Sequence, residues 1–210
     1  MQLIIATPSP YARKVRVALI EKNIEFETLI DNPWQPAARV ATVNPLGKVP
    51  ALVLDDGRVV HDSKVIFEYL ETLGRPPRLL PADAEMRILH KQIEAIADGI
   101  CDAAVLIVLE HARAAEMRSS DWVARQSNKI AAGLDELGRL LGGGRFFTSH
   151  GLGLAEIATG CALGYLGLRL PEFGSRARDH RLQELYTRLM ARASFAATIP
   201  TPQAIPEPAK

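Results

Sequence analysis

The sequence predicts an α/β N-terminal domain with a mixed four-stranded sheet, followed by an all-α C-terminal domain. Three observations lead to this fold class. Short apolar runs alternate with helical periodicity over residues 1–73, Pro and Gly interrupt the pattern at 74–81, and only helical periodicity follows. The 210 residues suffice for two small domains with separate cores. We expect a first domain over 1–74, a linker over 75–82, a helical domain over 83–198 and a Pro-rich tail over 199–210 that wraps the surface or frays.

The first domain opens with a strand, a helix and a second strand. Residues 3–6 and 26–30 are short apolar runs, which predict strands, and the apolar residues of 10–22 recur at helical spacing between them. Residues 36–43 predict only a weak helix or an irregular segment. A strand–helix–strand unit of this length is typical of two parallel strands joined by a crossover helix.

A hairpin and a helix complete the first domain. The apolar runs 51–54 and 58–60 flank Asp55-Asp56-Gly57, and an Asp-Gly step between two such runs is a strong hairpin signal. Residues 62–73 then place Ile66, Tyr69 and Leu70 on one helical face. This order of elements is that of a thioredoxin-like domain.

Long amphipathic helices account for the rest of the chain. One apolar stripe runs over residues 89–108 and another over 123–141, which ends in three glycines. A third helix is predicted near Gly153, with Glu156 as the N3 acceptor of a capping box and a hydrophobic staple beside it. A fourth covers roughly residues 178–191.

Composition excludes several classes of protein. The chain has 25 basic and 24 acidic residues and a net charge of +1, which argues against a dedicated nucleic-acid surface. The longest uncharged apolar run, 103–109, is too short to span a bilayer, and no signal peptide precedes the first strand. The two cysteines and five histidines show no metal-ligand spacing. We expect a cytoplasmic protein that binds neither metal, membrane nor nucleic acid.

Two motifs resemble the glutathione-binding half of a bacterial glutathione S-transferase with a serine-type active site. The motifs, in chain order, are Thr7-Pro8-Ser9-Pro10-Tyr11-Ala12-Arg13-Lys14-Val15-Arg16 and Val43-Asn44-Pro45-Leu46-Gly47-Lys48-Val49-Pro50, the second followed by His61-Asp62-Ser63. The resemblance covers the whole first domain and, beyond residue 81, rests on helical pattern and the capped helix near 153. It implies glutathione as co-substrate and a homodimer.

Ser9 is the candidate catalytic residue. Thioredoxin-like redox proteins carry C-x-x-C at this strand-to-helix turn, but here the four residues are Ser9-Pro10-Tyr11-Ala12, so the site cannot exchange disulfides. No G-x-S-x-G motif surrounds Ser9, which argues against a serine nucleophile. The remaining interpretations are a plain helix N-cap and, as the resemblance implies, a hydroxyl donor that stabilises the thiolate of glutathione.

The other candidate residues would hold the tripeptide. The resemblance implies a cis peptide at Val49–Pro50, so that the backbone of Val49 pairs with glutathione like an added strand. It also implies that Asp62 takes the γ-glutamyl ammonium and Ser63, at a helix N-terminus, the α-carboxylate. The family more often has Glu at the position of Asp62. Lys48 would meet the glycyl carboxylate, with a solvent-facing loop lysine as the alternative.

Several nearby residues have no assigned role at this stage. Tyr11 and Trp34 are candidates for the electrophile pocket, although Tyr11 also fits core packing. Arg13, with Lys14 and Arg16, adds positive charge near Ser9 or lies on a solvated helix face. Asp98 and Asp102, four residues apart, are candidate polar residues of the second domain or, more simply, part of a solvated face.

The function expected from the resemblance is conjugation of the glutathione thiolate to an electrophilic small molecule. Two alternatives stay open. One is a glutathione-dependent isomerase or dehalogenase that uses the same site. The other is a family member without catalysis that acts as an interaction or stress-response module, although such a module would not need to keep the whole glutathione motif. The sequence does not identify the electrophile.

Overall fold

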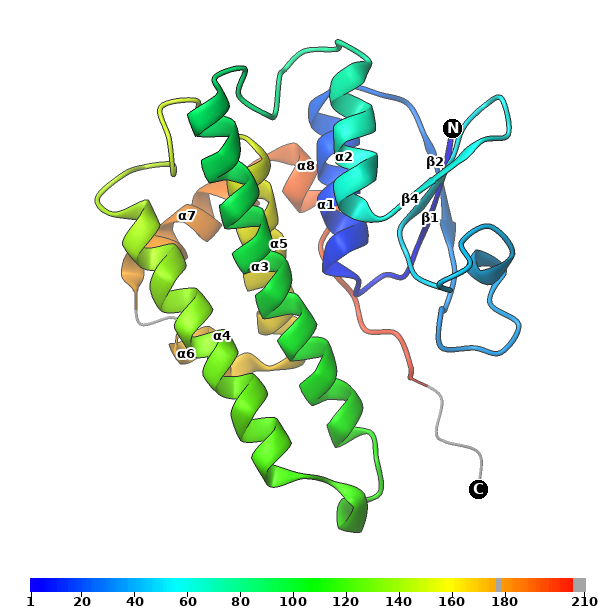
Figure 1. Ribbon diagram of the computed structural model, residues 1–210, viewed down its shortest axis with the longest axis vertical. Helices are drawn as coiled ribbons and strands as arrows, with labels where there is room; N and C mark the ends of the chain where they lie inside the picture. Colours follow the sequence, from blue (N-terminus) through cyan, green and yellow to red (C-terminus); the bar gives the residue numbers. More distant parts are fainter. Residues whose placement is uncertain (177–178, 206–210) are drawn as a thin grey trace. The chain divides into compact units, whose positions relative to one another are not determined.

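The first part of the chain folds as a four-stranded sheet with two helices on one face (Figure 1). The computed structural model describes residues 1–176 and 179–205. The sheet has the strand order β2-β1-β3-β4, formed by β1 (Gln2–Ile5), β2 (Glu27–Ile30), β3 (Ala51–Val53) and β4 (Val59–His61). β1 pairs in parallel with β2, and the other pairs are antiparallel. The predicted mixed sheet is confirmed.

Both faces of the sheet are covered. α1 (Pro10–Glu21) and α2 (Ser63–Thr72) pack against each other on one face (Figure 1). On the other, Ile4 and Ala51 pack with Ala38 and Val40, which come from the short helix η1 (Arg39–Thr42) and the residue before it. The segment 36–43, predicted as a weak helix or an irregular segment, contains η1 and closes the core on the second face, since alternate residues of β1 point to opposite sides.

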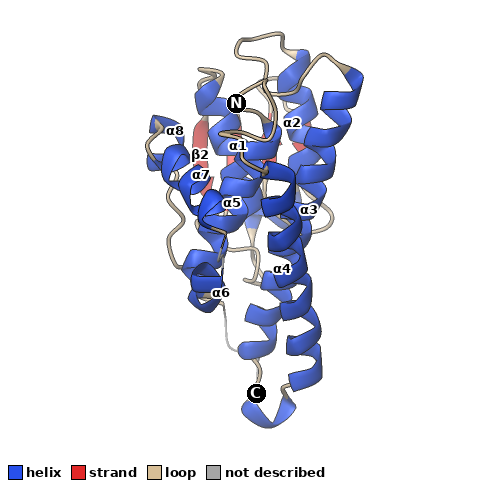
Figure 2. Ribbon diagram, turned by 90° about the vertical axis from the view of Figure 1, so that its left-hand side faces the viewer, coloured by secondary structure: helices blue, strands red, loops and turns tan. Residues whose placement is uncertain are grey.

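The helices between residues 84 and 190 form a second compact unit (Figure 2). Its core is α3 (Ala84–His111), which packs on both α4 (Ser120–Leu141) and α5 (Leu154–Arg169). Three shorter helices complete it: η2 (Ala115–Met117), α6 (Pro171–Arg176) and α7 (His180–Met190). The all-α second part is confirmed. None of the helices in the described ranges combines the length and apolar character needed to cross a membrane.

The capping box predicted for α5 is present. Gly153 has no side chain to cap the helix, but Glu156 at position N3 accepts hydrogen bonds from the backbone N–H groups of Gly153 and Phe147, both at 2.9 Å. Glu156 is fully buried. Burial raises the pKa of the Glu156 carboxyl to about 7, and the backbone N–H donors oppose this rise.

A segment near the C-terminus belongs to the N-terminal compact unit rather than to the helical one. The first unit comprises Met1–Leu79 together with the described residues 193–205, and the second begins at Leu80. The short helix α8 (Ala193–Ala196) packs on α1. The chain therefore returns to its N-terminal unit after leaving α7.

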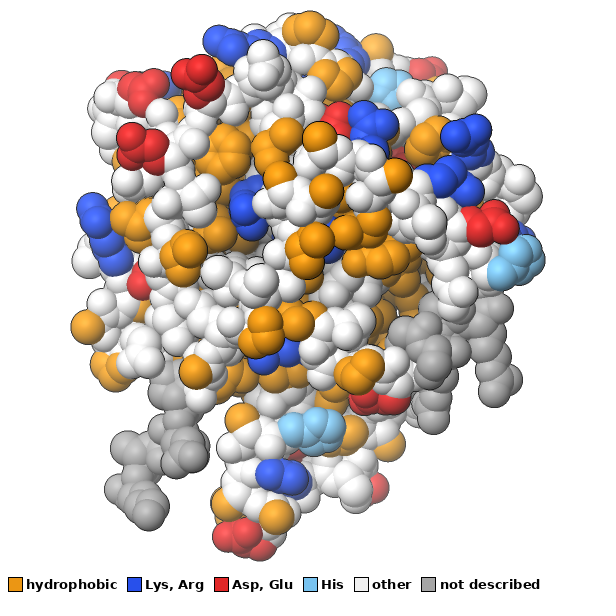
Figure 3. Space-filling model, turned by 180° about the vertical axis from the view of Figure 1, so that it is seen from behind, with side chains coloured by type: hydrophobic (Ala, Val, Ile, Leu, Met, Phe, Trp, Pro, Cys, Tyr) orange, Lys and Arg blue, Asp and Glu red, His pale blue; other side chains and the backbone are white. Residues whose placement is uncertain are grey.

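Charged side chains are dispersed over the face of the molecule drawn in Figure 3. On the face seen from behind, lysine and arginine side chains are interspersed with acidic and apolar ones (Figure 3). This distribution agrees with the near balance of 25 basic and 24 acidic residues. A continuous basic stripe, which is the usual mark of a nucleic-acid-binding surface, is not visible on this face of the described residues.

Candidate functional site

Ser9 caps helix α1, and the cap leaves its hydroxyl hydrogen unused. The Ser9 Oγ atom accepts a hydrogen bond from the backbone N–H of Ala12 at 3.2 Å, and Pro10 occupies the first turn of the helix. The backbone N–H of Ser9 donates to the carbonyl of Ala6 at 3.0 Å. A serine hydroxyl has one donor and two acceptor positions, so a hydroxyl that accepts in the cap still has a hydrogen to give. The two interpretations of Ser9 are therefore compatible.

Asn44 organises the loop that carries Lys48. Its side chain is 2% exposed; Nδ2 donates to the carbonyl of Lys48 at 2.7 Å and Oδ1 accepts from the N–H of Leu46 at 3.0 Å. Gly47 has φ +60°, a conformation that glycine adopts without a steric penalty. Lys48 is exposed, so its ammonium is presented to solvent by a loop that one buried side chain holds in shape.

The peptide bond between Val49 and Pro50 is cis, as predicted. Pro50 is buried and Val49 is half-buried. The paired part of β3 begins at Ala51, so Val49 precedes the ladder formed with β1 and β4. A backbone group just before the start of a ladder is well placed for pairing with an extended peptide.

Asp62 and Ser63 form a tight turn into α2. Asp62 has φ +70°, which is uncommon for a residue other than glycine, and its Oδ1 atom accepts from the N–H of Lys64 at 2.8 Å. Ser63 is the first residue of α2 and is 5% exposed. Within the described part of the chain, the Ser63 hydroxyl forms no hydrogen bond with a protein atom. The Ser63 hydroxyl therefore stays accessible at a helix N-terminus, an arrangement suited to an anionic ligand.

The register of the sheet brings these segments together. Ile4 lies opposite Ala51, and Ala51 lies opposite His61. Ser9 follows the end of β1 by four residues, Pro50 immediately precedes β3, and Asp62 immediately follows β4. All six predicted site residues, Ser9, Lys48, Val49, Pro50, Asp62 and Ser63, therefore belong to segments that meet at one end of the sheet.

The alternative of a solvated helix face is wrong for two of the three basic residues of α1. Arg13 and Lys14 are 2% and 1% exposed. Arg13 donates from Nη2 to the carbonyl of Phe195 at 3.2 Å, and its guanidinium lies 5.2 Å from the centre of the Phe195 ring. Arg16 is half-buried, and burial together with the neighbouring Arg13 lowers the pKa of its guanidinium. The helical pattern misses the burial of Arg13 because the segment that covers it comes from the far end of the sequence.

The remaining candidates occupy different environments. Tyr11 is half-buried and Trp34 is 47% exposed. Asp98 is 7% exposed on α3 whereas Asp102 is exposed, so a solvated face describes only the second. Asn44, which orders the Lys48 loop, was not identified from sequence; the Asn-Pro pair that marks the loop was the available signal.

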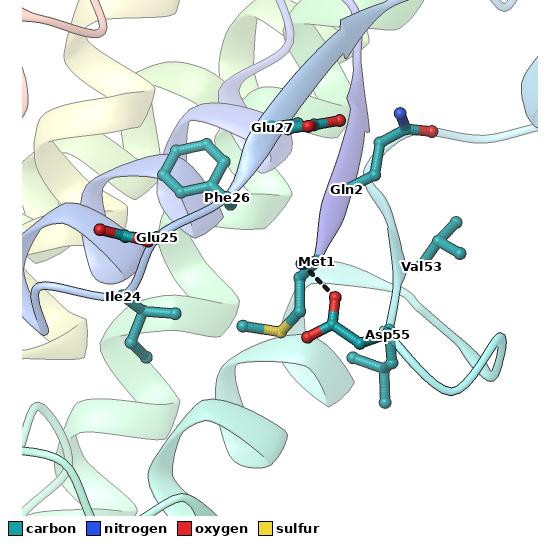
Figure 4. A pocket seen from close by; sticks show the side chains of 9 residues that line it. Met1, Gln2, Ile24, Glu25, Phe26, Glu27, Val53 and Asp55 are labelled. Carbon is teal, nitrogen blue, oxygen red and sulfur yellow. Dashed lines mark hydrogen bonds and ion pairs between the residues drawn. The ribbon is translucent and has the colours of Figure 1, made fainter.

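A pocket of about 800 Å³ lies at the other end of β1 (Figure 4). It is lined by Met1, Phe26, Leu54 and neighbouring residues, and the α-ammonium of Met1 lies 2.6 Å from Asp55 Oδ1. The candidate residues all follow or precede the opposite ends of the strands. This pocket is therefore separate from the candidate site.

Comparison with known proteins identifies both halves of the chain. Residues 8–73 match the family model described as the glutathione S-transferase N-terminal domain, and residues 120–191 match that of the C-terminal domain. An uncharacterized GST-like protein of Escherichia coli, YibF, is 40% identical over 200 residues, covering 95% of this chain and 98% of YibF. A maleylacetoacetate isomerase of Pseudomonas aeruginosa is 29% identical over 75% of this chain and 77% of its own length.

Two solved structures are similar over nearly the whole chain. A glutathione S-transferase of Methylobacterium radiotolerans, in complex with glutathione sulfonate, has a TM-score of 0.95 and 44% identity, and the match covers 100% of this chain and 99% of that one. A glutathione S-transferase of Methylobacillus flagellatus with glutathione bound has a TM-score of 0.90 and 40% identity over 95% of this chain and 99% of that one.

Proposed function

Because this chain belongs to the glutathione S-transferase family, we propose that it binds glutathione and transfers the glutathionyl group to an electrophilic small molecule. The observation that carries the proposal is the state of the Ser9 hydroxyl. It accepts from Ala12 within the cap of α1 and keeps its hydrogen for a ligand, at the end of the sheet where the Val49–Pro50 and Asp62–Ser63 segments also meet.

Stabilisation of the thiolate is the chemical step assigned to Ser9. A thiol with an ordinary pKa of about 8.5 is only a few per cent ionised near neutral pH, and the thiolate is the nucleophile. A hydrogen bond from Ser9 and the positive end of α1 both favour the anion. The sulfur lone pair then forms the bond to an electrophilic carbon. In a substitution the leaving group departs with its bonding electrons; in an addition the carbanion takes a proton.

The other residues are assigned to the tripeptide. In this proposal the backbone of Val49, set by cis Pro50, pairs with the backbone of glutathione, and Lys48 attracts the glycyl carboxylate. Ser63 binds the γ-glutamyl carboxylate through its hydroxyl and the N-terminus of α2. Asp62 takes the ammonium through Oδ2, because Oδ1 accepts from Lys64.

Calorimetric titration with glutathione tests the proposal, followed by a rate assay with a panel of electrophiles. We expect binding at millimolar ligand or below and faster conjugation than in buffer. Absence of binding would refute the proposal. Binding without turnover of any electrophile would favour the alternative of a family member that is not catalytic.

An isomerase is the second candidate, because the relative from Pseudomonas aeruginosa is named a maleylacetoacetate isomerase. The same thiolate would add to a carbon–carbon double bond, allow rotation about the resulting single bond, and leave again. Glutathione is then regenerated, whereas conjugation consumes it. Measuring free thiol before and after complete turnover of a cis-alkene substrate therefore distinguishes the two reactions.

The proposal also includes a homodimer located in the cytoplasm. Val65 on α2 and Leu73 just after it are 54% and 38% exposed, and a two-fold interface formed by α2 would cover both side chains. Sedimentation at micromolar concentration should give twice the monomer mass of 22.9 kDa. A monomer at that concentration would argue against the assembly.

A further inference from the structure

The C-terminal segment is anchored on α1 before it reaches the region of Ser9. Arg13 donates from Nε to Thr198 Oγ1 at 3.4 Å, in addition to its contacts with Phe195. Arg16 donates to the carbonyl of Ala197 at 3.3 Å. These bonds hold residues 195–198 along α1, the helix that Ser9 caps. The path of the residues that follow Thr198 therefore starts from α1.

Residues 201–204 then cross the ends of β1 and β2. Thr7, two residues before Ser9, donates from Oγ1 to the carbonyl of Thr201 at 3.1 Å. Asn32 donates from Nδ2 to the carbonyl of Ala204 at 2.9 Å, and Gln203 donates from Nε2 to the carbonyl of Asp31 at 3.0 Å.

The two anchor points lie side by side on the sheet. The backbone N–H of Asp31 donates to the carbonyl of Ile5 at 2.7 Å, which places the loop after β2 beside the segment that leads from β1 to Ser9. The segment 201–204 thus spans a short distance immediately next to the Ser9 turn. A ligand atom held by Ser9 would therefore lie near this segment, because Thr7 joins the two.

The segment carries no charge. Residues 193–205 contain no Lys, Arg, Asp or Glu. The one acidic side chain among its anchors, Asp31, directs Oδ1 to the N–H of Asn32 at 2.9 Å and Oδ2 to the N–H of Val40 at 2.7 Å. Thr201, Pro202 and Ala204 are exposed. The side chains that this segment exposes are therefore small and uncharged.

We propose that residues 201–204 form the wall of the electrophile site beside the glutathione sulfur, and that this uncharged wall selects neutral electrophiles over anionic ones. The inference rests on the proposed function. Thr201 is the specificity-determining position, because its carbonyl is fixed by Thr7 while its side chain is exposed. A charge added there enters the site without removing any anchoring bond.

The test introduces that charge. Rates are measured with dinitrochlorobenzene, which is neutral, and with chloronitrobenzoate, in which a carboxylate replaces one nitro group; each rate is divided by that of the uncatalysed reaction. Thr201→Lys should raise the ratio of kcat/KM for the anionic to the neutral probe about three- to tenfold, and Thr201→Glu should lower it, as expected for a charge pair in a partly solvated site. The Kd for glutathione should stay unchanged.

Thr187→Lys is the matched control. Thr187 is an exposed threonine of α7 in the helical unit, and its Oγ1 donates to the carbonyl of Gln183 within the helix. An equal ratio in the wild type, Thr201→Lys and Thr201→Glu, with normal turnover of the neutral probe, would overturn the assignment of the wall and leave the proposed function intact. A change of the same size in Thr187→Lys would show that net charge alone is responsible. Failure of glutathione binding in the wild type would overturn the proposed function instead.

Discussion

The Nδ2 atom of Asn44 donates to the carbonyl oxygen of Lys48 at 2.7 Å, across the loop that ends in the cis Val49–Pro50 peptide. Asn44 is 2% exposed, so this bond is partly shielded from water. The position of Lys48 and of the Val49 backbone therefore depends on a side chain that itself has no place in the proposed contacts with glutathione.

We expect Asn44→Ala to weaken glutathione binding about tenfold. The substitution leaves the part-buried carbonyl of Lys48 and the N–H of Leu46 without their partner, which costs about 1–3 kcal/mol and frees the loop. Calorimetry gives the affinity, and urea unfolding gives the stability. Asn128→Ala, at an exposed position on α4, serves as control. Wild-type affinity in a folded Asn44→Ala variant would contradict a role for this loop.

Ser63→Ala should lower the affinity for glutathione more than it lowers stability. The lost bond to a carboxylate corresponds to about 1.5–3 kcal/mol, or about ten- to a hundredfold in Kd. The fold should be little affected, because the cap of α2 comes from Asp62. Ser120→Ala, at the first position of α4, is the matched control and should leave Kd unchanged. An unaltered Kd in Ser63→Ala would remove Ser63 from the site.

Much of this fold can be predicted from local patterns. The predicted strand at 58–60 is found at Val59–His61, and the predicted helix at 10–22 at Pro10–Glu21. The differences of one residue lie at element ends, where capping rather than periodicity decides. The position of the site segments also follows, because a hairpin register fixes which residues share one end of the sheet.

Contacts between distant parts of the chain could not be predicted in the same way. Periodicity assigns Arg13 to a polar face, and only the return of Phe195 explains its burial. Likewise, the sequence of the linker does not indicate that Lys22 binds it. The Lys22 side chain donates to the carbonyls of Arg75 and Pro77, both at 2.9 Å. A local pattern records which residues share a face but not what covers that face.

Replacing Lys22 should destabilise the first unit strongly. Its ammonium lies 2.8 Å from Glu71 Oε1, and the two side chains are 1% and 11% exposed. Lys22→Met leaves a buried carboxylate without its cation, for which we expect a loss of about 3–5 kcal/mol in the free energy of unfolding. Lys22→Met with Glu71→Gln should recover part of that loss.

An exposed ion pair provides the comparison for Lys22. Arg58 and Asp56 lie 2.7 Å apart with side chains 72% and 52% exposed, so Arg58→Met should change stability by less than about 1 kcal/mol. Both effects are measured by urea unfolding. A loss in Lys22→Met no larger than that in Arg58→Met would contradict the account of the linker anchor.

The pH dependence of stability should change in Glu156→Gln. Burial raises the pKa of Glu156 from 4.5 to about 7 in the folded protein, so the folded state binds the proton more tightly than the unfolded state. The stability from this group is complete below pH 4.5 and is lost as pH rises through about 7, with a slope of at most about 1.4 kcal/mol per pH unit. In Glu156→Gln, this loss of stability with rising pH should be absent.

The Glu156→Gln variant distinguishes the contribution of Glu156 to the pH dependence of stability from that of His90. Burial, with a smaller contribution from His150, lowers the pKa of His90 from 6.5 to about 4, so His90 adds stability above pH 6.5 that is lost as pH falls through about 4. The two trends oppose each other in the wild type, and the variant keeps only that of His90. Urea midpoints from about pH 5 to 8 should therefore fall less with pH in Glu156→Gln. Parallel curves would contradict the raised pKa.

Ser9→Cys should behave differently from a simple loss of the hydroxyl. A thiol at the N-terminus of α1 is acidified by the helix end, and it should form a mixed disulfide with oxidised glutathione. Mass spectrometry after incubation with glutathione disulfide should show one added glutathionyl group. The same treatment of the wild type controls for Cys101 and Cys161, both of which are buried. No difference between the two proteins would argue against an accessible position for residue 9.

The central claim is that the Ser9 hydroxyl donates to the bound thiolate, and the ionisation of bound glutathione tests it most directly. The thiolate absorbance is titrated with pH in the wild type, Ser9→Ala and Ser119→Ala; Ser119 caps α4 through a 3.2 Å bond from Trp122, so its variant reports the loss of a cap alone. The account predicts a pKa of bound glutathione about one to two units higher in Ser9→Ala only, with unchanged glutathione affinity and a conjugation defect that shrinks at alkaline pH. A wild-type pKa for glutathione bound to Ser9→Ala, with conjugation at the wild-type rate near neutral pH, would contradict the account and reduce Ser9 to a helix cap.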